Sequence, residues 1–158
     1  MSALNSKLIS RNIDDFIHHS ISGPNKNFIV GLDIGKLKCG TAVSDESLRV
    51  AIPIQIVSTI LLSGYLDNLS KSLGHFGLVI GCPINLMNEF GRSAYYICEI
   101  VDKISETINS NNIPIWFHDE RYSTINSKSM LKASLKYNLV DDLCAMSILQ
   151  EFLDTYRF

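Results

Sequence analysis

Short apolar runs and helical spacings of apolar residues alternate along the chain. The short runs predict five strands, over residues 28–33, 39–44, 50–57, 78–81 and 113–117. Apolar residues at helical spacing predict helices over 61–73, 92–108, 123–135 and 140–153. Because proline cannot donate a ladder hydrogen bond, Pro53 is expected to put the third strand at a sheet edge or beside a bulge.

The order of these elements predicts the fold class. Three strands come in succession, with a turn at Gly35 after the first, and the later strands alternate with helices. The expected fold is α/β, with one mixed five-stranded sheet flanked by helices, formed by residues 27–158. Residues 1–26 are expected to form an N-terminal extension. Its apolar residues from Leu8 to Ile17 predict an accessory helix, and the turn-rich stretch from Ser22 to Asn25 predicts a linker.

Composition and charge restrict the possible classes of protein. A chain of 158 residues can form one domain with a sizeable core. No apolar run approaches the ~18 to 20 residues that cross a bilayer, and no secretory signal opens the chain, so we expect a cytoplasmic protein without membrane contact. A net charge of −2 means that any contact with nucleic acid would need a local basic patch. The cysteines lack zinc-site spacing and are expected to be buried thiols; they are Cys39, Cys82, Cys98 and Cys144.

Carboxylates follow two predicted strands and open the last predicted helix. Asp33 ends an apolar strand, where an open α/β sheet presents side chains to a crevice, although an aspartate there can also serve the hairpin turn. His118-Asp119-Glu120-Arg121 follows the last predicted strand, and a solvated charge cluster is the alternative for it. Asp141 and Asp142 begin a helix, where acids also favour the positive end of the dipole. Together, these three positions can converge on one cleft.

Three converging carboxylates predict a divalent metal site. Hard oxygen ligands suit Mg²⁺ or Mn²⁺. Two such ions about 3.5 to 4 Å apart can clamp the attacking and leaving oxygens of a phosphodiester, so the predicted chemistry is phosphodiester hydrolysis. Arg121, Lys38 and Lys36 are candidates to hold substrate phosphates, the arginine through a bidentate fork. Ordinary surface charge is the alternative, above all for Lys36.

Four motifs, in order, resemble those of the YqgF family. They are Gly31-Leu32-Asp33-Ile34-Gly35 with Lys38, Gly40 and Ala42-Val43-Ser44-Asp45; Gly81-Cys82-Pro83-Ile84-Asn85; Asp119-Glu120-Arg121-Tyr122-Ser123-Thr124; and Val140-Asp141 through to Gln150. Together the motifs cover residues 28 to 154. One segment departs from the family pattern, because Met87-Asn88-Glu89-Phe90 stands where the family has an Asp-Gly-Ser/Thr turn.

The resemblance implies an RNase H-like fold with a resolvase-like nuclease site. It also implies a role in maturing the 5′ end of 16S ribosomal RNA. Carried over by motif, the catalytic and metal-binding acids are Asp33, Glu120 and Asp141. Asp119 of the same motif is a further, secondary candidate, whereas Asp142 does not align with a family acid. The expected partners are structured RNA, in particular pre-16S ribosomal RNA, or branched DNA.

Other functions agree with parts of the sequence. An actin-like phosphotransferase also places Asp-Ile-Gly after a strand, but its cleft needs two such domains. A non-catalytic protein that binds RNA or a ribosome-assembly partner would use the acids for folding alone. A Holliday-junction resolvase would share the chemistry and cut DNA as a homodimer, because it cleaves two strands symmetrically. The sequence does not settle dimerisation.

Overall fold

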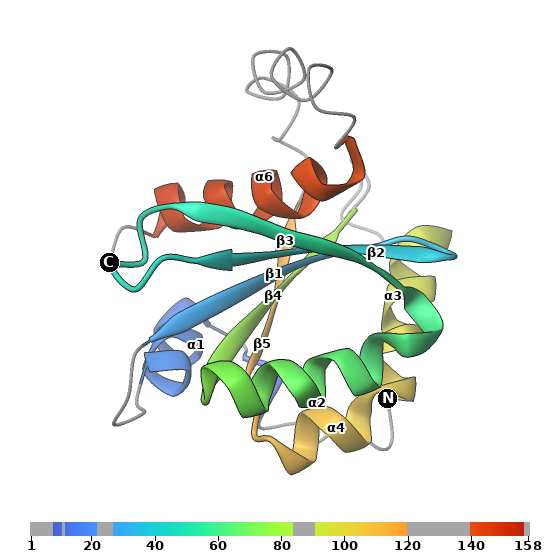
Figure 1. Ribbon diagram of the computed structural model, residues 1–158, viewed down its shortest axis with the longest axis horizontal. Helices are drawn as coiled ribbons and strands as arrows, with labels where there is room; N and C mark the ends of the chain where they lie inside the picture. The colour runs from blue at the N-terminus through green and yellow to red at the C-terminus, as the bar shows by residue number, and fades with distance from the viewer. Residues whose placement is uncertain (1–7, 11, 22–26, 84–90, 120–139, 157–158) are drawn as a thin grey trace.

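The chain folds around one five-stranded sheet (Figure 1). The computed structural model describes residues 8–10, 12–21, 27–83, 91–119 and 140–156, with side chains of the last range from residue 143 onward. The strands are β1 (Phe28–Ile34), β2 (Lys38–Ser44), β3 (Ala51–Ser58), β4 (Phe76–Cys82) and β5 (Ile115–Asp119). The helices are α1 (Ile13–Ile21), η1 (Thr59–Leu61), α2 (Leu62–Leu73), α3 (Arg92–Lys103), α4 (Ser105–Ser110) and α6 (Val140–Thr155). None of the helices in these ranges is both long and apolar enough to cross a bilayer.

Strand directions bring three strand ends to one edge of the sheet. The strand order is β3-β2-β1-β4-β5. β1, β4 and β5 run parallel, whereas β2 is antiparallel to both of its neighbours. The predicted mixed sheet flanked by helices is therefore confirmed. We call the edge at which β1, β4 and β5 end the carboxyl edge, because ligands of open α/β sheets bind at such an edge.

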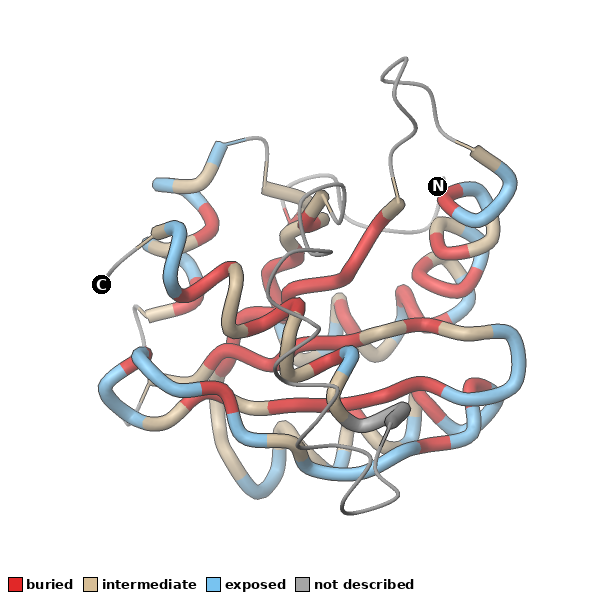
Figure 2. Tube along the Cα trace, turned by 90° about the horizontal axis from the view of Figure 1, so that it is seen from above, coloured by how far each residue is buried: buried red, intermediate tan, exposed pale blue. Residues whose placement is uncertain are grey.

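Apolar cores lie on both faces of the sheet. Along β1 the side chains alternate, so Val30 and Leu32 face α2, α3 and α4, whereas Ile29 faces α1 and α6. β1 and β4 lie inside the sheet and are buried almost throughout, as their continuous apolar runs predict (Figure 2). α6 covers one face, and α2 and α4 cover the other (Figure 1).

β3 forms one edge of the sheet, as Pro53 predicts. The ladder between β2 and β3 also shifts register after Thr41, which marks a bulge. The buried Thr41 hydroxyl donates to the Gln55 carbonyl at 2.7 Å. The Gln55 N–H in turn donates to the Thr41 hydroxyl at 3.3 Å, so this side chain bridges the two strands at the irregularity.

The prediction of one helix over 92–108 is wrong, because the structure has two helices there. α3 ends and α4 begins on either side of Ile104, whose φ of −96° and ψ of 7° leave the helical region. Ile100, Ile104 and Ile108 nevertheless face the same core. Apolar periodicity therefore runs through the break and could not reveal it.

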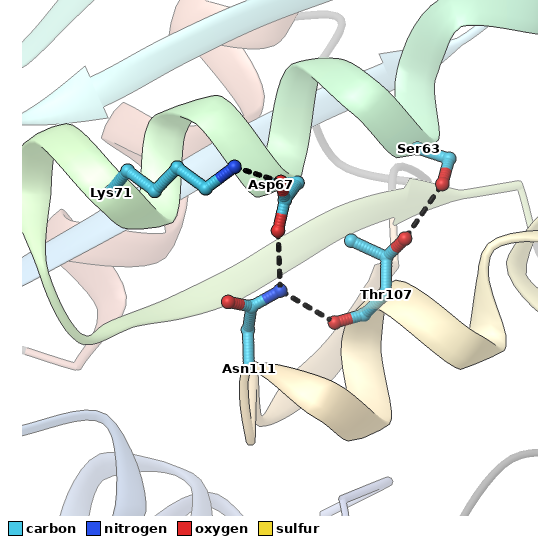
Figure 3. Close-up of polar contacts among 5 residues, drawn as sticks. All are labelled: Ser63, Asp67, Lys71, Thr107 and Asn111. Carbon is cyan, nitrogen blue, oxygen red and sulfur yellow. Dashed lines mark hydrogen bonds and ion pairs between the residues drawn. The ribbon is translucent and has the colours of Figure 1, made fainter.

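Polar side chains connect α4 to α2 (Figure 3). Ser63 Oγ and Thr107 Oγ1 lie 2.6 Å apart. Asp67 accepts hydrogen bonds from Lys71 Nζ at 2.6 Å and from Asn111 Nδ2 at 3.4 Å. Asn111 Nδ2 also donates to the Thr107 carbonyl at 3.0 Å. The Asp67–Lys71 ion pair lies within α2 and is exposed, so it contributes little to stability. The contacts of Ser63 with Thr107 and of Asp67 with Asn111 are those that connect the two segments.

The last strand lies two residues further along the chain than predicted. β5 spans Ile115–Asp119 instead of 113–117, in parallel register with β4. Pro114 precedes the strand, and it has no N–H to donate to a ladder. His118 therefore lies within the strand at 7% exposure, and not in a loop after it. The helix predicted over 123–135 lies outside the described residues.

The N-terminal extension contacts both an edge and a face of the sheet. Leu8 and Ile9, predicted as part of a helix, instead lie beside β5. Ile9 bridges Ile115, and the Ile115 N–H donates to the Leu8 carbonyl at 2.7 Å. The helix begins later, at Ile13, and its Phe16 is fully buried in the core that α6 covers. The boundary between the extension and the main domain stays a prediction.

The cysteines follow the prediction only in part. Cys39 and Cys82 are buried, whereas Cys98 is half-buried and Cys144 is exposed. Cys144 contradicts the prediction because it is exposed on α6. Burial and, secondly, the negative charge of Asp33 raise the pKa of the Cys39 thiol to about 12. That thiol is therefore protonated and unreactive near neutral pH.

Candidate active site

Asp33 lies at the carboxyl edge, on the face of the sheet that α6 covers. Side chains alternate along β1, so Asp33 shares a face with Ile29 and Gly31. Asp33 is half-buried and is one of the residues that line a cavity of about 330 Å³. A carboxylate at a strand end beside a cavity is the arrangement in which open α/β sheets present catalytic groups.

The turn that follows Asp33 is fixed by close backbone contacts. The Gly35 N–H donates to the Lys38 carbonyl at 2.9 Å, and a Cβ on Gly35 would lie 2.7 Å from that oxygen. Only glycine fits this approach without opening the turn. The Thr59 hydroxyl donates to the Gly35 carbonyl at 2.9 Å. These bonds fix the turn that carries Lys36 to the cavity.

α6 begins toward the carboxyl edge. Gln150, late in the helix, accepts the Ala51 N–H at 2.9 Å, and Ala51 opens β3 at the opposite end of the sheet. Earlier in the helix, Ala145 lies against Gly31 in the middle of β1. The helix therefore approaches the carboxyl edge as it is followed back to its first residue.

This direction brings the backbone of Asp141 toward Asp33. Asp141 precedes Ala145 by one helical turn, about 5.4 Å along the axis. Asp33 follows Gly31 by two strand residues, about 6.6 Å in the same direction. The backbone at Asp141 and the side chain of Asp33 therefore belong to the same end of the same face. The side chains of Asp141 and Asp142 lie outside the described residues.

Gly31 permits this close approach of α6. A Cβ at this position would lie 2.8 Å from Leu149 Cβ and 3.0 Å from the Ala145 carbonyl oxygen. Gly31→Ala is expected to lower the free energy of unfolding by about 1 to 3 kcal/mol, because overpacking forces the backbone to shift. Gly64→Ala is the control, since Gly64 is exposed in the first turn of α2 and nothing lies within 4 Å of its added Cβ.

Gly64→Ala is expected to raise the free energy of unfolding by about 0.5 to 1 kcal/mol, because alanine loses less backbone entropy in a helix. Urea unfolding of both variants measures whether the free energy of unfolding falls for Gly31→Ala and rises for Gly64→Ala. A Gly31→Ala variant as stable as the wild type would contradict the close packing of α6 on β1.

The cavity beside Asp33 has walls from three segments. They contribute Asp33 and Lys36 from β1 and its turn, Gly81 and Pro83 from the end of β4, and Arg92 and Tyr96 from α3. Neither Arg92 nor Tyr96 is among the residues predicted from the sequence. Arg92 is the first residue of α3, a position at which the helix dipole favours an acidic side chain. A cation at the start of a predicted helix is therefore the sequence signal that could have identified Arg92.

Asp119 and His118, at the end of β5, point to opposite faces of the sheet. His118 packs edge-on against Phe152 of α6 at a centroid distance of 6.1 Å, and its Nε2 lies 3.8 Å from Glu151 Oε2. Burial lowers the pKa of His118, and the Glu151 carboxylate partly offsets this effect. Alternation then puts Asp119 on the α3 face, opposite to that of Asp33. Within the predicted cluster His118-Asp119-Glu120-Arg121, the first two residues are therefore divided between the two faces of the sheet, and His118 packs into the core.

The predicted ligands and phosphate contacts are only partly described. Asp33 is the one predicted metal ligand whose side chain is described, and Glu120 and Arg121 lie outside the described residues. Lys38 is exposed at the start of β2 and is not among the residues that line the cavity, whereas Lys36 is. Within the described ranges, no three His, Cys, Asp or Glu side chains lie close enough together to hold an ion.

The fold has a solved counterpart. The structure of Thermus thermophilus RuvC in complex with Holliday junction substrate matches with a TM-score of 0.54 and 12% identity, covering 82% of this chain and 96% of the RuvC chain. The mixed sheet and this likeness define the fold as RNase H-like. The chain belongs to the RuvX (YqgF) family, described as Holliday junction resolvase, whose family model matches residues 27–155. The predicted family and fold are thereby confirmed.

Curated relatives extend over nearly the whole chain. A protein of Ehrlichia canis (strain Jake) is 34% identical over 158 residues, covering 95% of this chain and 97% of its own length. A protein of Pelagibacter ubique (strain HTCC1062) is 30% identical over 150 residues, covering 90% of this chain and 95% of its own length. Both carry the name "Putative pre-16S rRNA nuclease". The family is thus one of hydrolases that act on phosphodiester bonds.

Proposed function

We propose that this protein is a metal-dependent endonuclease that cleaves structured RNA during 5′-end maturation of pre-16S ribosomal RNA. The observation that carries the proposal is the position of Asp33, half-buried at the carboxyl edge beside the cavity and on the face where α6 begins. The names of the relatives support RNA as the substrate. This substrate would place the protein in the cytoplasm.

The acids suit Mg²⁺ or Mn²⁺. The fit depends on the donors, because carboxylate oxygens are the ligands that these hard cations prefer. Asp33 offers such an oxygen at the cavity, and Glu120 and Asp141 are the proposed further ligands. Bound ions would supply an activated water and stabilise the departing 3′-oxygen. Asp119 is the weaker candidate because its side chain faces away from that of Asp33.

The chain's own residues would orient the substrate. Lys36 lies at the cavity, and Lys38 and Arg121 belong to the family motifs. Cations at such positions hold phosphates without reading bases, so recognition would depend on the shape and backbone of the nucleic acid.

A Holliday-junction resolvase is the second candidate function. The family description and the likeness to RuvC favour it. A resolvase would act on branched DNA and would need a homodimer, because it makes two symmetric cuts.

The test is cleavage of a 5′-extended 16S precursor RNA and, beside it, of a four-way DNA junction. Wild type and Asp33→Asn are compared in Mg²⁺, in Mn²⁺ and in EDTA. We expect wild type to cut the RNA with either metal, and we expect no cut in EDTA or by Asp33→Asn. Cutting of the junction alone would favour the resolvase, and cutting in EDTA would contradict metal dependence. Binding of RNA without any cleavage would favour the non-catalytic alternative.

A further inference from the structure

Two cations and a single acid line the cavity among the described residues. Among the described residues that line the cavity, the charged side chains are Asp33, Lys36 and Arg92. Arg92 is exposed and forms no ion pair with another residue of the described ranges. Lys36 is also exposed, on the turn after β1. Lys36, Arg92 and Asp33 therefore line the same cavity at the carboxyl edge.

Tyr96 connects the two cationic segments. Its hydroxyl donates to the Lys36 carbonyl at 3.1 Å, so α3 holds the β1–β2 turn directly. Tyr96 is half-buried and also lines the cavity, one helical turn after Arg92. The bond fixes the backbone from which the Lys36 side chain extends. The bond therefore joins the backbone of Lys36 to the helix that carries Arg92.

We propose that Arg92 and Lys36 bind the phosphate next to the scissile bond, and that Tyr96 is the positioning residue for Lys36. That this phosphate neighbours the bond to be cut rests on the proposed function, whereas the binding of a phosphate does not. A guanidinium offers a planar fork that matches two phosphate oxygens, and an ammonium adds a point charge. Neither group reads base identity, so the contact serves any nucleic acid strand that enters the cavity.

The size of the cavity is consistent with one strand. Its volume of about 330 Å³ is at the lower end of the ~300 to 1,000 Å³ that ligand pockets occupy. This space suits a sugar-phosphate unit and not a duplex. Tyr96 and Ile97 supply apolar wall beside the two cations.

The first arm of the test measures binding without catalysis. Affinity for the 5′-extended RNA and for the four-way junction is measured in EDTA as a function of salt concentration. Arg92→Gln is expected to weaken binding about tenfold, because it removes one charged hydrogen-bonding group. It should also reduce the slope of log affinity against log salt by about 0.7 to 0.9, the value for one phosphate contact. Arg49→Gln is the matched control, since Arg49 is exposed in the β2–β3 turn at the other end of the sheet.

The second arm separates positioning from folding. Tyr96→Phe removes only the hydroxyl and is expected to raise KM about fivefold with kcat and the unfolding temperature unchanged. Tyr95→Phe is the control, because Tyr95 is 66% exposed and does not line the cavity. An unchanged KM, or a change in kcat alone, would overturn the positioning role. If the wild type does not cleave, the dissociation constant in EDTA replaces KM.

The outcomes distinguish this inference from the proposed function. Wild type that binds but never cleaves would refute the nuclease, while the effect of Arg92→Gln on the salt slope would still decide the phosphate contact. Wild type that cleaves, with Arg92→Gln indistinguishable from Arg49→Gln, would overturn the inference alone. Wild type that binds neither nucleic acid would overturn both.

Discussion

Asp33→Asn is expected to lower the rate of metal-dependent cleavage at least about a thousandfold and to leave the fold intact. A bound ion stabilises transition-state charge by several kcal/mol, and each ~1.4 kcal/mol corresponds to a factor of ten in rate. Asparagine keeps the shape of aspartate but replaces an anionic oxygen with an amide nitrogen that cannot bind a cation. Single-turnover rates at saturating Mg²⁺ or Mn²⁺ measure the loss. Urea unfolding measures whether the fold is retained.

The other two proposed ligands should behave in the same way. Glu120→Gln and Asp141→Asn are expected to lose cleavage as Asp33→Asn does, because all three acids would hold the same ions. Asp142→Asn is the matched control, since it removes the same charge from the adjacent position of α6 and should stay within about twofold of wild type. Full activity in Glu120→Gln or Asp141→Asn would show that the motif register chosen for that residue is wrong.

The sequence predicts best those elements whose burial depends on their own residues. β1 and β4 are continuous apolar runs, and a strand of this composition is stable only when both faces are covered. Pro53 likewise predicts its own place at the sheet edge, because its missing N–H excludes it from a central strand. The sequence predicts the place of Asp33 in the same way, as a carboxylate at the end of an apolar run, and the structure puts it next to the last residue of β1.

The sequence predicts less well the location of residues whose burial or pairing depends on another helix or strand. His118 looks like a loop residue until β4 and α6 provide the ladder and the aromatic contact that bury it. Leu8 and Ile9 fit a helical pattern, but the free edge of β5 offers them backbone partners instead. Arg92 and Tyr96 have no motif, because their role depends on the turn that lies across the cavity from α3.

Phe16→Ala is expected to lower the free energy of unfolding by about 3 to 5 kcal/mol. Phe16 has no exposed surface, and its ring lies 5.6 Å from Phe152 of α6 and 6.2 Å from Trp116 of β5. Its removal would leave a cavity between three elements, which cannot all relax into it. Typical domains have about 5 to 15 kcal/mol of stability in total, so the loss would be a large fraction of it.

Ile60→Ala is the control for this substitution, because Ile60 is 88% exposed and should change stability by less than about 0.5 kcal/mol. Urea unfolding of both variants tests whether α1 belongs to the same cooperative unit as the sheet. The family model begins at residue 27, after α1, so the family match does not require this helix. A loss below about 1 kcal/mol for Phe16→Ala would mean that α1 docks loosely. A loss of about 3 to 5 kcal/mol in the free energy of unfolding would mean that the extension supports the core against which α6 packs. It would then also support the position of Asp141, which α6 carries.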